Sequence, residues 1–443
     1  MADEGTLLRS LLQLRHLTQH SAFDVQFQRT AKSLAEREGD PRIAKVTVSE
    51  RTLKRWVNGE VATMPRPYTC RVLEAMFGHP VLALLSPAAL PAPDQPGTID
   101  TGQRDDDIGR TLSMAARRAR QFSAMADTTN IGPDSLRQLQ DEAARLAQVY
   151  PVEPLALLLP DLAALQDDSL TLLEGRQPPR YARDLYVVAA LASGMLAKAS
   201  HDLRDPRQAM THARLAWQCA SNAGHDSLGA WVRGLESLIK YWDGQPREAR
   251  EYALAGLDIP VEGTVRVWLY ALQGRAEAIL GNPSGALAAI DQAASARERI
   301  TPDDLDAIGG MCRFDVEREL YYAADAGVMI PAQFSRSPLG TRAARYAQEA
   351  IDAYAAATAP SFGDQAGAHS ALAIARVRAG DVDGAAEAIA PVLALPATMR
   401  INGVVSSAVA VHRELATVPD ASVAAETQAA IEAFCHVPAA LAQ

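Results

Sequence analysis

Apolar residues recur at helical spacing along most of the chain, and a short segment near its start shows the pattern most clearly. On a wheel of 3.6 residues per turn, three apolar residues of this segment fall on one face: Leu53, Trp56 and Val57. Ser49 is placed to cap the free N–H groups of the first turn, and Gly59 to end the helix in the left-handed conformation. The pattern predicts a helix from about Glu50 to Asn58.

The opposite face of this predicted helix carries hydrogen-bond donors: Arg51, Lys54, Arg55 and Asn58. Arginine can bind guanine through two hydrogen bonds, asparagine can bind adenine, and lysine can bind a phosphate, so such a face suits the major groove of DNA. Charged faces are also common on ordinary surface helices. Taken by itself, the segment leaves both interpretations open.

The segments on both sides of this helix are also helical in pattern. Two runs before it have apolar or small residues at helical spacing: Leu7, Leu8, Leu11, Leu14 and Leu17 in the first, and Phe23, Phe27, Thr30, Ala31 and Leu34 in the second. After it, Pro67 is placed to open a helix that Gly78 ends. Residues 1–90 are therefore predicted to form four or five short helices.

Three stretches of this region resemble the phage-repressor-like (XRE) helix-turn-helix family, in the variant that begins many actinobacterial regulators: Phe27-Gln-Arg-Thr-Ala-Lys-Ser-Leu-Ala35, Val48-Ser-Glu-Arg-Thr-Leu-Lys-Arg-Trp56 and Leu73-Glu-Ala-Met-Phe-Gly78. The resemblance implies that the helix starting at Glu50 is the recognition helix. The chain departs from the family at residues 39–45, which lengthen the connection before that helix. A longer connection alters the angle between the two helices and so shifts individual base contacts.

On this interpretation, the DNA-binding residues divide into two groups. Arg51, Arg55 and Asn58 would read base edges, while Lys45, Ser49 and Lys54 would position the phosphates. Thr52, on the same helix, completes the predicted set.

From Arg183 onward, a tight turn recurs ahead of a helix: Leu203-Arg-Asp-Pro-Arg-Gln-Ala209, Asp243-Gly-Gln-Pro-Arg-Glu-Ala249, Leu280-Gly-Asn-Pro-Ser-Gly-Ala286 and Ala379-Gly-Asp-Val-Asp-Gly-Ala385. The final alanines are 40, 37 and 99 residues apart, and the last step leaves room for two units. The pattern resembles the tetratricopeptide repeat (TPR), a pair of antiparallel helices in which a small Ala lets the backbones approach. A non-repeating helical bundle is the alternative, but the recurring turn favours a helix-pair solenoid.

Further segments of the body resemble a large set of streptomycete-type regulators that join the same helix-turn-helix head to a helical-repeat body: Gly175-Arg-Gln-Pro-Pro-Arg180, Ala209-Met-Thr-His-Ala-Arg-Leu-Ala-Trp217, residues 229–244, Arg266-Val-Trp-Leu269 and Ile431-Glu-Ala-Phe-Cys435. The resemblance implies a transcriptional regulator and says little about any ligand. A solenoid of this kind has a concave surface built from the first helix of each pair. Its candidate ligand- or partner-binding residues are Arg183, Tyr186, Trp231, Arg233, Lys240, Arg266, Trp268, Tyr270 and Arg275. The alternative is that the aromatic residues of this set fill the core and that most of the charged ones are solvated.

The expected fold class is all-α, an N-terminal helix-turn-helix domain followed by a TPR-like solenoid. Prolines and an acidic run after residue 86 cannot continue a helix. The predicted organisation is therefore a helix-turn-helix domain at 1–86, a linker at 87–107, a helical connecting region at 108–180 and a TPR-like sensor or dimerisation domain at 181–443. The connecting region opens with a helix predicted from Ile108 to Ala126.

The net charge of −10 is unevenly distributed. Residues 1–90 hold 12 Lys and Arg against 9 Asp and Glu, which leaves 31 against 44 for the remainder. A weakly basic head on an acidic body fits nucleic acid held at one end only. Because the basic excess is small, firm binding is expected to need a homodimer on a two-fold symmetric operator.

Enzyme, metal and secretion signals are missing from the sequence. No phosphate-binding glycine loop, dinucleotide fingerprint, His-Glu-x-x-His motif or Gly-x-Ser-x-Gly elbow occurs, so no catalytic residue, cofactor or metal site is predicted. The four cysteines are widely spaced, which is typical of isolated thiols in a reducing compartment. Neither a signal peptide nor a membrane span is recognisable, so the expected location is the cytoplasm.

These observations predict a one-component transcriptional regulator, with double-stranded DNA bound by the head and a homodimer interface, a small-molecule or peptide effector site, or both, in the body. The alternative is a TPR adaptor that binds a protein partner and has little or no affinity for DNA. Salt dependence separates the two, because DNA binding through several phosphates weakens steeply as salt rises.

Overall fold

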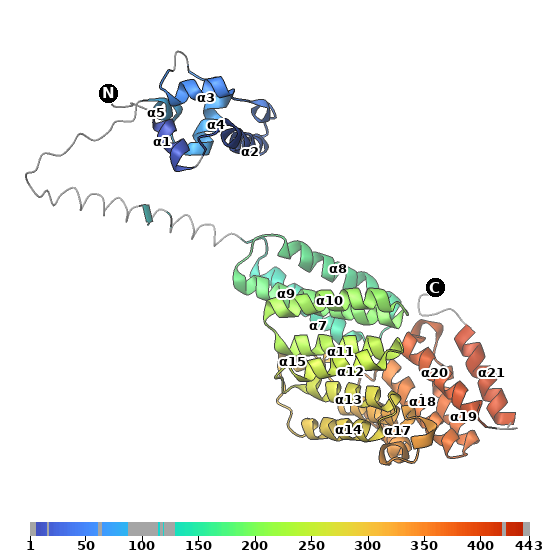
Figure 1. The fold of residues 1–443 in the computed structure, drawn as a ribbon. Coiled ribbons are helices and arrows are strands. Elements are labelled where there is room, and N and C mark those ends of the chain that lie inside the picture. Colours follow the sequence, from blue (N-terminus) through green and yellow to red (C-terminus); the bar gives the residue numbers. More distant parts are fainter. Residues whose placement is uncertain are drawn as a thin grey trace, which may run out of the picture. The chain divides into compact units, whose positions relative to one another are not determined.

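The structure, a computed structural model, describes residues 6–15, 17–60, 64–86, 114–115, 118, 129–418 and 422–436. The regular elements in these residues are helices and not strands, so the predicted all-α class is confirmed (Figure 1). The chain divides into two compact units, Met1–Gly109 and Arg110–Gln443. The predicted linker at 87–107 lies outside the described residues, as does most of the helix predicted from Ile108 to Ala126.

The first unit is a group of short helices (Figure 1): α1 (Leu7–Leu14), α2 (His20–Glu38), the 3-10 helix η1 (Ile43–Lys45), α3 (Glu50–Val57), α4 (Pro67–Phe77) and α5 (Val81–Leu85). All of these helices contribute buried apolar side chains to one core, among them Leu8, Phe27, Trp56, Leu73 and Leu84. The prediction of four or five short helices is confirmed, with five α-helices among the described residues of this unit.

Helix α3 forms with the predicted caps. The Ser49 side chain accepts a hydrogen bond from the backbone N–H of Thr52, and Gly59 has a φ of 75°. Leu53 and Trp56 are buried in the core, which leaves the opposite face of the helix outside. The hydroxyl of Thr6 donates to the carbonyl oxygen of Trp56 over 3.0 Å and ties the end of α3 to the start of the unit.

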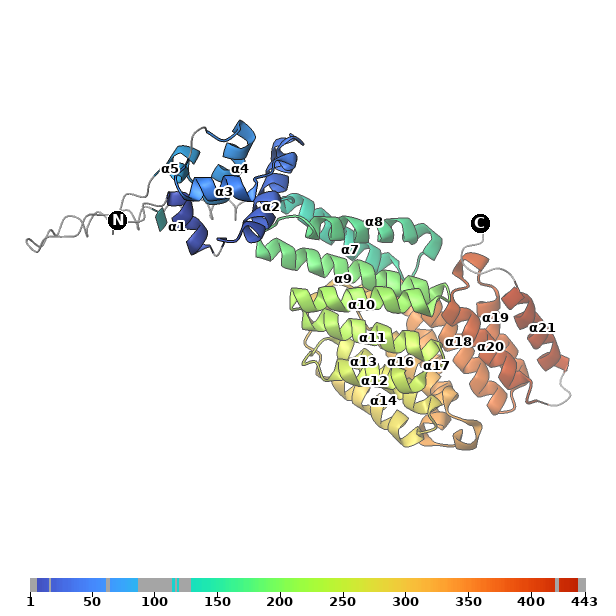
Figure 2. The same ribbon diagram turned by 45° about the horizontal axis from the view of Figure 1, so that its top comes forward.

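The second unit is built from helix pairs stacked in chain order (Figures 1 and 2): α7 (Pro133–Val149) with α8 (Leu155–Leu173), α9 (Pro179–Asp202) with α10 (Pro206–Ala223), α11 (Asp226–Trp242) with α12 (Pro246–Leu257), α13 (Thr264–Ile279) with α14 (Pro283–Arg297), α16 (Val316–Met329) with α17 (Pro338–Ala356), α18 (Phe362–Arg378) with α19 (Val382–Leu393), and α20 (Asn402–Leu415) with α21 (Ser422–His436). Four short elements lie between these helices: α15 (Asp304–Ile308), η2 (Gly310–Cys312), η3 (Ala332–Phe334) and η4 (Ala397–Met399). From α9 onward, the first helix of each pair packs on the first helix of the next.

The recurring turn of the sequence has one geometry at all four places. In each, a residue with positive φ ends the first helix: Arg204 at 66°, Gly244 at 72°, Gly281 at 74° and Gly380 at 82°. The next residue is the N-cap of the second helix, and proline opens that helix in three of the four turns. The four alanines that follow are fully buried: Ala209, Ala249, Ala286 and Ala385. A small side chain at that position lets the two helices of a pair pack closely.

Glycines also set the spacing between successive first helices. A Cβ atom added to Gly194 of α9 would overlap the ring of Trp231 on α11, and one added to Gly234 of α11 would overlap the ring of Trp268 on α13. Each tryptophan thus packs directly on the backbone of the preceding helix. The two contacts repeat from one pair to the next.

The two ends of the stack meet. Helix α20 packs on α9, and η4 packs on α8. The backbone N–H of Phe362 donates to the carbonyl oxygen of Pro151 over 3.2 Å, which joins the α7–α8 turn to the start of α18. The pairs therefore curve around a central space, lined by residues from Gln148 on α7 to Val404 on α20.

Candidate functional site

The exposed face of α3 is the first candidate site. Arg51, Lys54, Arg55 and Asn58 are all exposed. Lys54 forms an ion pair with Glu50 at 2.8 Å, and Nη2 of Arg55 donates to the carbonyl oxygen of Glu60 over 3.3 Å. Within the described residues Arg51 makes neither an ion pair nor a side-chain hydrogen bond, so its guanidinium is available to a ligand.

The remaining predicted DNA-binding residues lie beside this face. Lys45 is exposed at the end of η1. The Ser49 hydroxyl caps α3 and lies 2.8 Å from the hydroxyl of Thr52, so both groups already have partners. A groove of about 250 Å³ runs along this side of α3 and also involves Arg66, a basic residue that the sequence analysis does not single out. Three exposed cations therefore lie on α3 itself, and two more, Lys45 and Arg66, lie on the segments before and after it.

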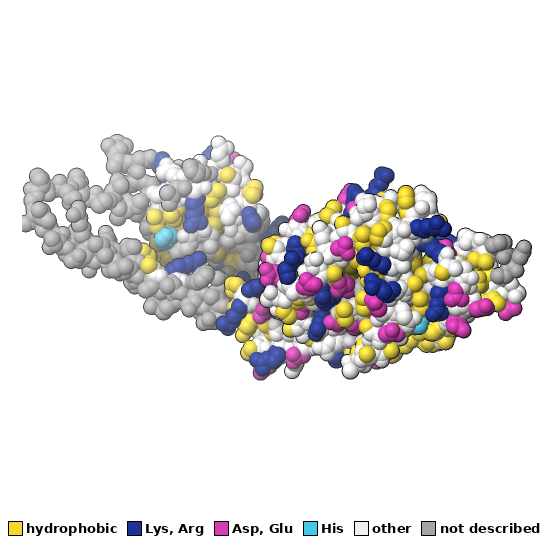
Figure 3. All heavy atoms as spheres, turned by 90° about the horizontal axis from the view of Figure 1, so that it is seen from below, with side chains coloured by type: hydrophobic (Ala, Val, Ile, Leu, Met, Phe, Trp, Pro, Cys, Tyr) yellow, Lys and Arg dark blue, Asp and Glu magenta, His cyan; other side chains and the backbone are white. Residues whose placement is uncertain are grey.

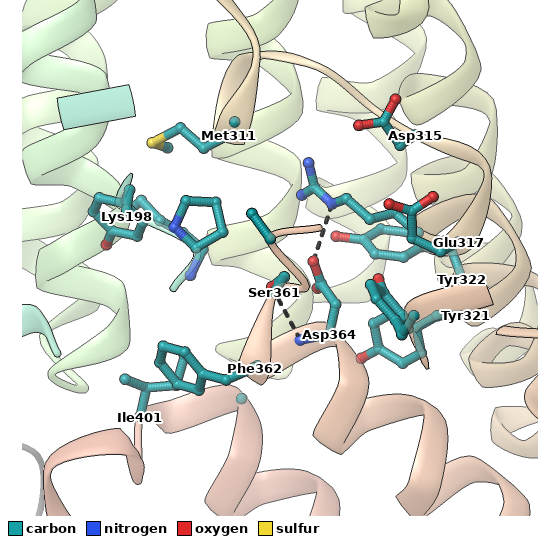
Figure 4. Close-up of a pocket in the computed structure, with 18 of the residues that line it drawn as sticks. Lys198, Met311, Asp315, Glu317, Tyr321, Tyr322, Ser361, Phe362, Asp364 and Ile401 are labelled. Atoms are coloured by element: carbon teal, nitrogen blue, oxygen red, sulfur yellow. Dashed lines mark hydrogen bonds and ion pairs between the residues drawn. The ribbon is translucent and has the colours of Figure 1, made fainter. Parts of the chain in front are cut away.

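The second candidate site is a cavity of about 870 Å³ in the second unit. Its wall is formed by the turn after α7, the ends of α9, α11 and α13, the start of α16, the α17–α18 turn and the start of α20. Figure 4 shows Lys198 and Met311 on one side of this space, with Glu317, Tyr321, Tyr322 and Asp364 on the other. Segments more than 200 residues apart in the sequence thus meet around one space.

Aromatic side chains make up much of the cavity wall: Tyr150, Trp242, Trp268, Tyr321, Tyr322, Tyr354 and Phe362. Tyr321 and Tyr322 pack edge to face with ring centroids 5.3 Å apart. The indole N–H of Trp268 donates to the hydroxyl of Tyr322 over 3.4 Å, so these rings form a connected cluster. A wall of this kind, with a few polar groups, is typical of sites for small organic ligands.

Each cation in the cavity wall lies beside its own carboxylate. Lys198 is 2.6 Å from Asp202, Arg275 is 2.7 Å from Asp325, and Arg318 is 3.0 Å from Asp364. The Tyr150 hydroxyl also donates to Asp202 over 2.9 Å. The three positive charges are therefore neutralised within the protein.

The pKa values of two buried groups near Lys198 are shifted from their usual range. Burial, together with the nearby Lys198 and Arg275 cations, holds the pKa of His201 well below its usual range. Burial also raises the pKa of Asp202, although Lys198 opposes that shift. His201 lines the cavity as a neutral imidazole, and the described residues give its ring no hydrogen bond.

Two of the predicted groove residues, Trp268 and Arg275, line the cavity. The other predicted groove residues do not line this cavity, and their side chains make contacts elsewhere. Trp231 is buried in the core and donates its indole N–H to Met311, and Tyr186 is half-buried against the same core. The other contacts are Arg183 with the carbonyl of Ala223, Arg233 with Glu236 and the Trp217 ring, Lys240 with Glu248, and Arg266 with Tyr270.

Several cavity residues are missing from the sequence analysis, notably Lys198, Asp202, Arg318, Tyr354 and Asp364. One local signal points to a buried charge next to the cavity, at a residue that does not line it. Asp325 stands between alanines inside an otherwise apolar helical segment, and a carboxylate there needs a buried cationic partner. The identity of that partner, Arg275, has no local signal.

Known proteins offer no guide to either site, since no family model, no curated protein and no solved structure matches the chain. Within the described residues, no group of three His, Cys, Asp or Glu side chains is arranged to hold a metal ion. None of the helices described is long and apolar enough to cross a membrane. On the face of the molecule seen in Figure 3, acidic and basic side chains of the second unit are interspersed.

Proposed function

We propose that the protein is a one-component transcriptional regulator that binds operator DNA through a helix-turn-helix head and senses an effector in a TPR-like body. The observation that carries this proposal is the division of α3 into two faces. Leu53 and Trp56 fix the helix in the core, while Arg51, Lys54 and Arg55 project from the other side. A rigid helix with exposed donors at this spacing matches the width and hydrogen-bonding pattern of the major groove.

In the proposed complex, Arg51, Arg55 and Asn58 read base edges, and Lys45 and Lys54 bind phosphates. Lys54 would exchange its exposed partner Glu50 for a phosphate, at little cost because exposed ion pairs contribute little. Two heads are needed for firm binding, so the protein acts as a homodimer on a two-fold symmetric operator.

The cavity gives the body a means of sensing. Its wall includes residues from both ends of the helix stack, so a ligand inside it contacts helix pairs that are far apart in the sequence. A ligand that binds the closed stack more tightly than an opened one shifts the population toward the closed form. In a dimer, that shift would change the spacing of the two heads and hence operator affinity.

The test compares the full chain with a variant in which Arg51→Ala and Arg55→Ala are combined. Binding to the DNA upstream of its own gene and to a random duplex pool is measured at two salt concentrations. The matched control is Arg342→Ala with Arg345→Ala, two exposed arginines on α17. The proposal is supported if the wild type and the control bind DNA specifically and the α3 variant binds it with an affinity lower by about tenfold or more.

Equal DNA binding by all three proteins would show that the DNA-binding site does not depend on Arg51 and Arg55 of α3. No salt-sensitive binding by the wild type to either DNA would instead favour an adaptor that binds a protein partner.

A further inference from the structure

One wall of the cavity combines carboxylates with aromatic rings. The first turn of α16 carries Glu317, and Tyr321 lies one turn further along the same helix. Asp364 near the start of α18 belongs to the same wall (Figure 4). Tyr354 at the end of α17 also lines the cavity. Ring faces and carboxylates are the two groups that proteins use to hold organic cations.

The charges around the cavity do not cancel on this side. Lys198, Arg275 and Arg318 each have their own carboxylate, as described above. Glu317, in the first turn of α16, has no ion-pair partner among the described residues. An anion entering the cavity would meet this negative charge where water screens it poorly, whereas a cation would be attracted.

The same aromatic cluster already stabilises one buried cation. The Arg275 guanidinium lies 4.1 Å from the ring centroid of Tyr241 and 4.4 Å from that of Tyr322, and its side chain is 1% exposed. Cation–ring contacts are strongest where water is excluded. The Tyr322 ring and its neighbour Tyr321 border the empty part of the site as well.

The Tyr354 hydroxyl adds a polar anchor. It is buried, it has no hydrogen-bond partner among the residues that the structure describes, and its side chain lines the cavity. Burial, followed by the nearby carboxylates of Asp364 and Glu317, raises the pKa of Tyr354 well above its usual value. The hydroxyl therefore keeps its proton, and its oxygen can accept an N–H group from a ligand.

We propose that the cavity binds a lipophilic organic cation, with a protonated or quaternary nitrogen beside Glu317, Tyr321 and Tyr354 and an apolar body against Trp242, Trp268 and Met311. The volume of about 870 Å³ lies within the range of pockets that bury drug-sized molecules. An extended peptide fits less well, because the Phe362–Pro151 hydrogen bond and the packing of α20 on α9 close the space. Binding of such a ligand does not depend on the proposed function; only its effect on operator affinity does.

Two xanthene dyes of opposite charge test the ligand class on the full-length protein. Fluorescence anisotropy is followed for rhodamine 6G, a lipophilic cation, and for fluorescein, an anion built on the same ring system. We expect saturable binding of rhodamine 6G and binding of fluorescein that is weaker by about tenfold or more, because carboxylates in a poorly hydrated cavity repel an anion.

Three variants locate the binding site. Glu317→Gln should weaken rhodamine 6G binding by about fivefold to tenfold, since it removes one charge and keeps the shape. Glu387→Gln, an exposed acid on α19 outside the cavity, should leave the affinity unchanged. Ala353→Phe fills part of the cavity and should abolish binding while retaining the helical circular dichroism spectrum.

Equal affinity for the two dyes, no binding of rhodamine 6G, or unchanged affinity in Glu317→Gln would each overturn the proposed ligand class. DNA binding is measured separately, on the same protein preparations before any dye is added. A failure of the ligand class is therefore distinguishable from a failure of the regulator proposal.

Discussion

The Arg275 guanidinium and the Asp325 carboxylate form a fully buried ion pair at 2.7 Å, with side chains 1% and 4% exposed. It joins α13 to α16, and the Tyr241 hydroxyl donates to the same carboxylate over 2.9 Å. Removing two charges from water is costly, and the pair recovers that cost only while both partners are present. The pair thus fixes how two helix pairs meet at the wall of the cavity.

Asp325→Asn is expected to lower the free energy of unfolding by about 3 to 5 kcal/mol, because it leaves the Arg275 charge buried without a counterion. Urea denaturation followed by tryptophan fluorescence measures the change. Replacing both partners by apolar residues, as in Arg275→Met with Asp325→Leu, should cost less than the single substitution. A single variant within about 1 kcal/mol of wild type would contradict this account of the pair.

Gly234→Ala should destabilise the second unit by about 1 to 3 kcal/mol, since the added methyl group would overlap the Trp268 ring and force the helices apart. Gly229, on the same helix, is the matched control. A Cβ there would lie 3.5 Å from the Trp217 ring, an ordinary contact. Gly229→Ala should therefore be neutral or stabilise by up to about 1 kcal/mol through helix propensity. Similar thermal unfolding midpoints for the two variants would refute the packing argument.

His201 should make the stability fall on acidification. Its pKa is well below 6.5 in the folded protein because of burial and the nearby cations, while in the unfolded chain it titrates near 6.5. Below pH 6.5 the unfolded state binds more protons than the folded state, so the free energy of unfolding rises with pH across this window. In this pH window, His201 alone adds up to about 1.4 kcal/mol per pH unit to the slope of the free energy of unfolding against pH.

His201→Gln lacks that titration and should lose less stability between pH 7.5 and 5.5 than the wild type does. Denaturation curves at several pH values give the two slopes. Comparing slopes avoids confusion with the packing lost through the substitution, and equal slopes would show that His201 is not held neutral.

If α3 binds DNA as proposed, Lys54→Gln should weaken binding about equally for all sequences and reduce the slope of log affinity against log salt by about 1. The reason is the loss of one phosphate contact. Lys240→Gln, on α11 of the second unit, is the control and should leave the slope unchanged. A change in base preference in Lys54→Gln would instead place Lys54 against a base edge.

Much of the fold could be predicted from the sequence because its signals are local. The cap at Ser49, the glycine at 59 and the apolar face of α3 act within one or two helical turns, and the structure reproduces them. The turns that end in Ala209 and Ala286 likewise depend on neighbouring residues, in which a positive φ, a capping side chain and a proline occur in sequence. The DNA-binding role assigned to α3 and the proposed dimer stay predictions.

The concave groove was the part that sequence reasoning could not place. Helical periodicity identifies which residues face a neighbour, but it does not say whether that neighbour is the second helix of the pair, the next pair or an open space. Arg233 and Arg275 both lie on first helices, yet Arg233 stacks on Trp217 of α10 and only Arg275 reaches the cavity wall.

The sequence by itself determined the helices, their caps and their pairing, because these follow from backbone hydrogen bonding and from side chains a few residues apart. Only the tertiary structure decided the cavity, its aromatic wall and the ion pairs that join separate helices beside it, Arg275–Asp325 and Arg318–Asp364. These depend on the curvature of the whole stack, a sum of small rotations at every pair interface. That curvature brings Pro151 within hydrogen-bonding distance of Phe362 and closes the space between them.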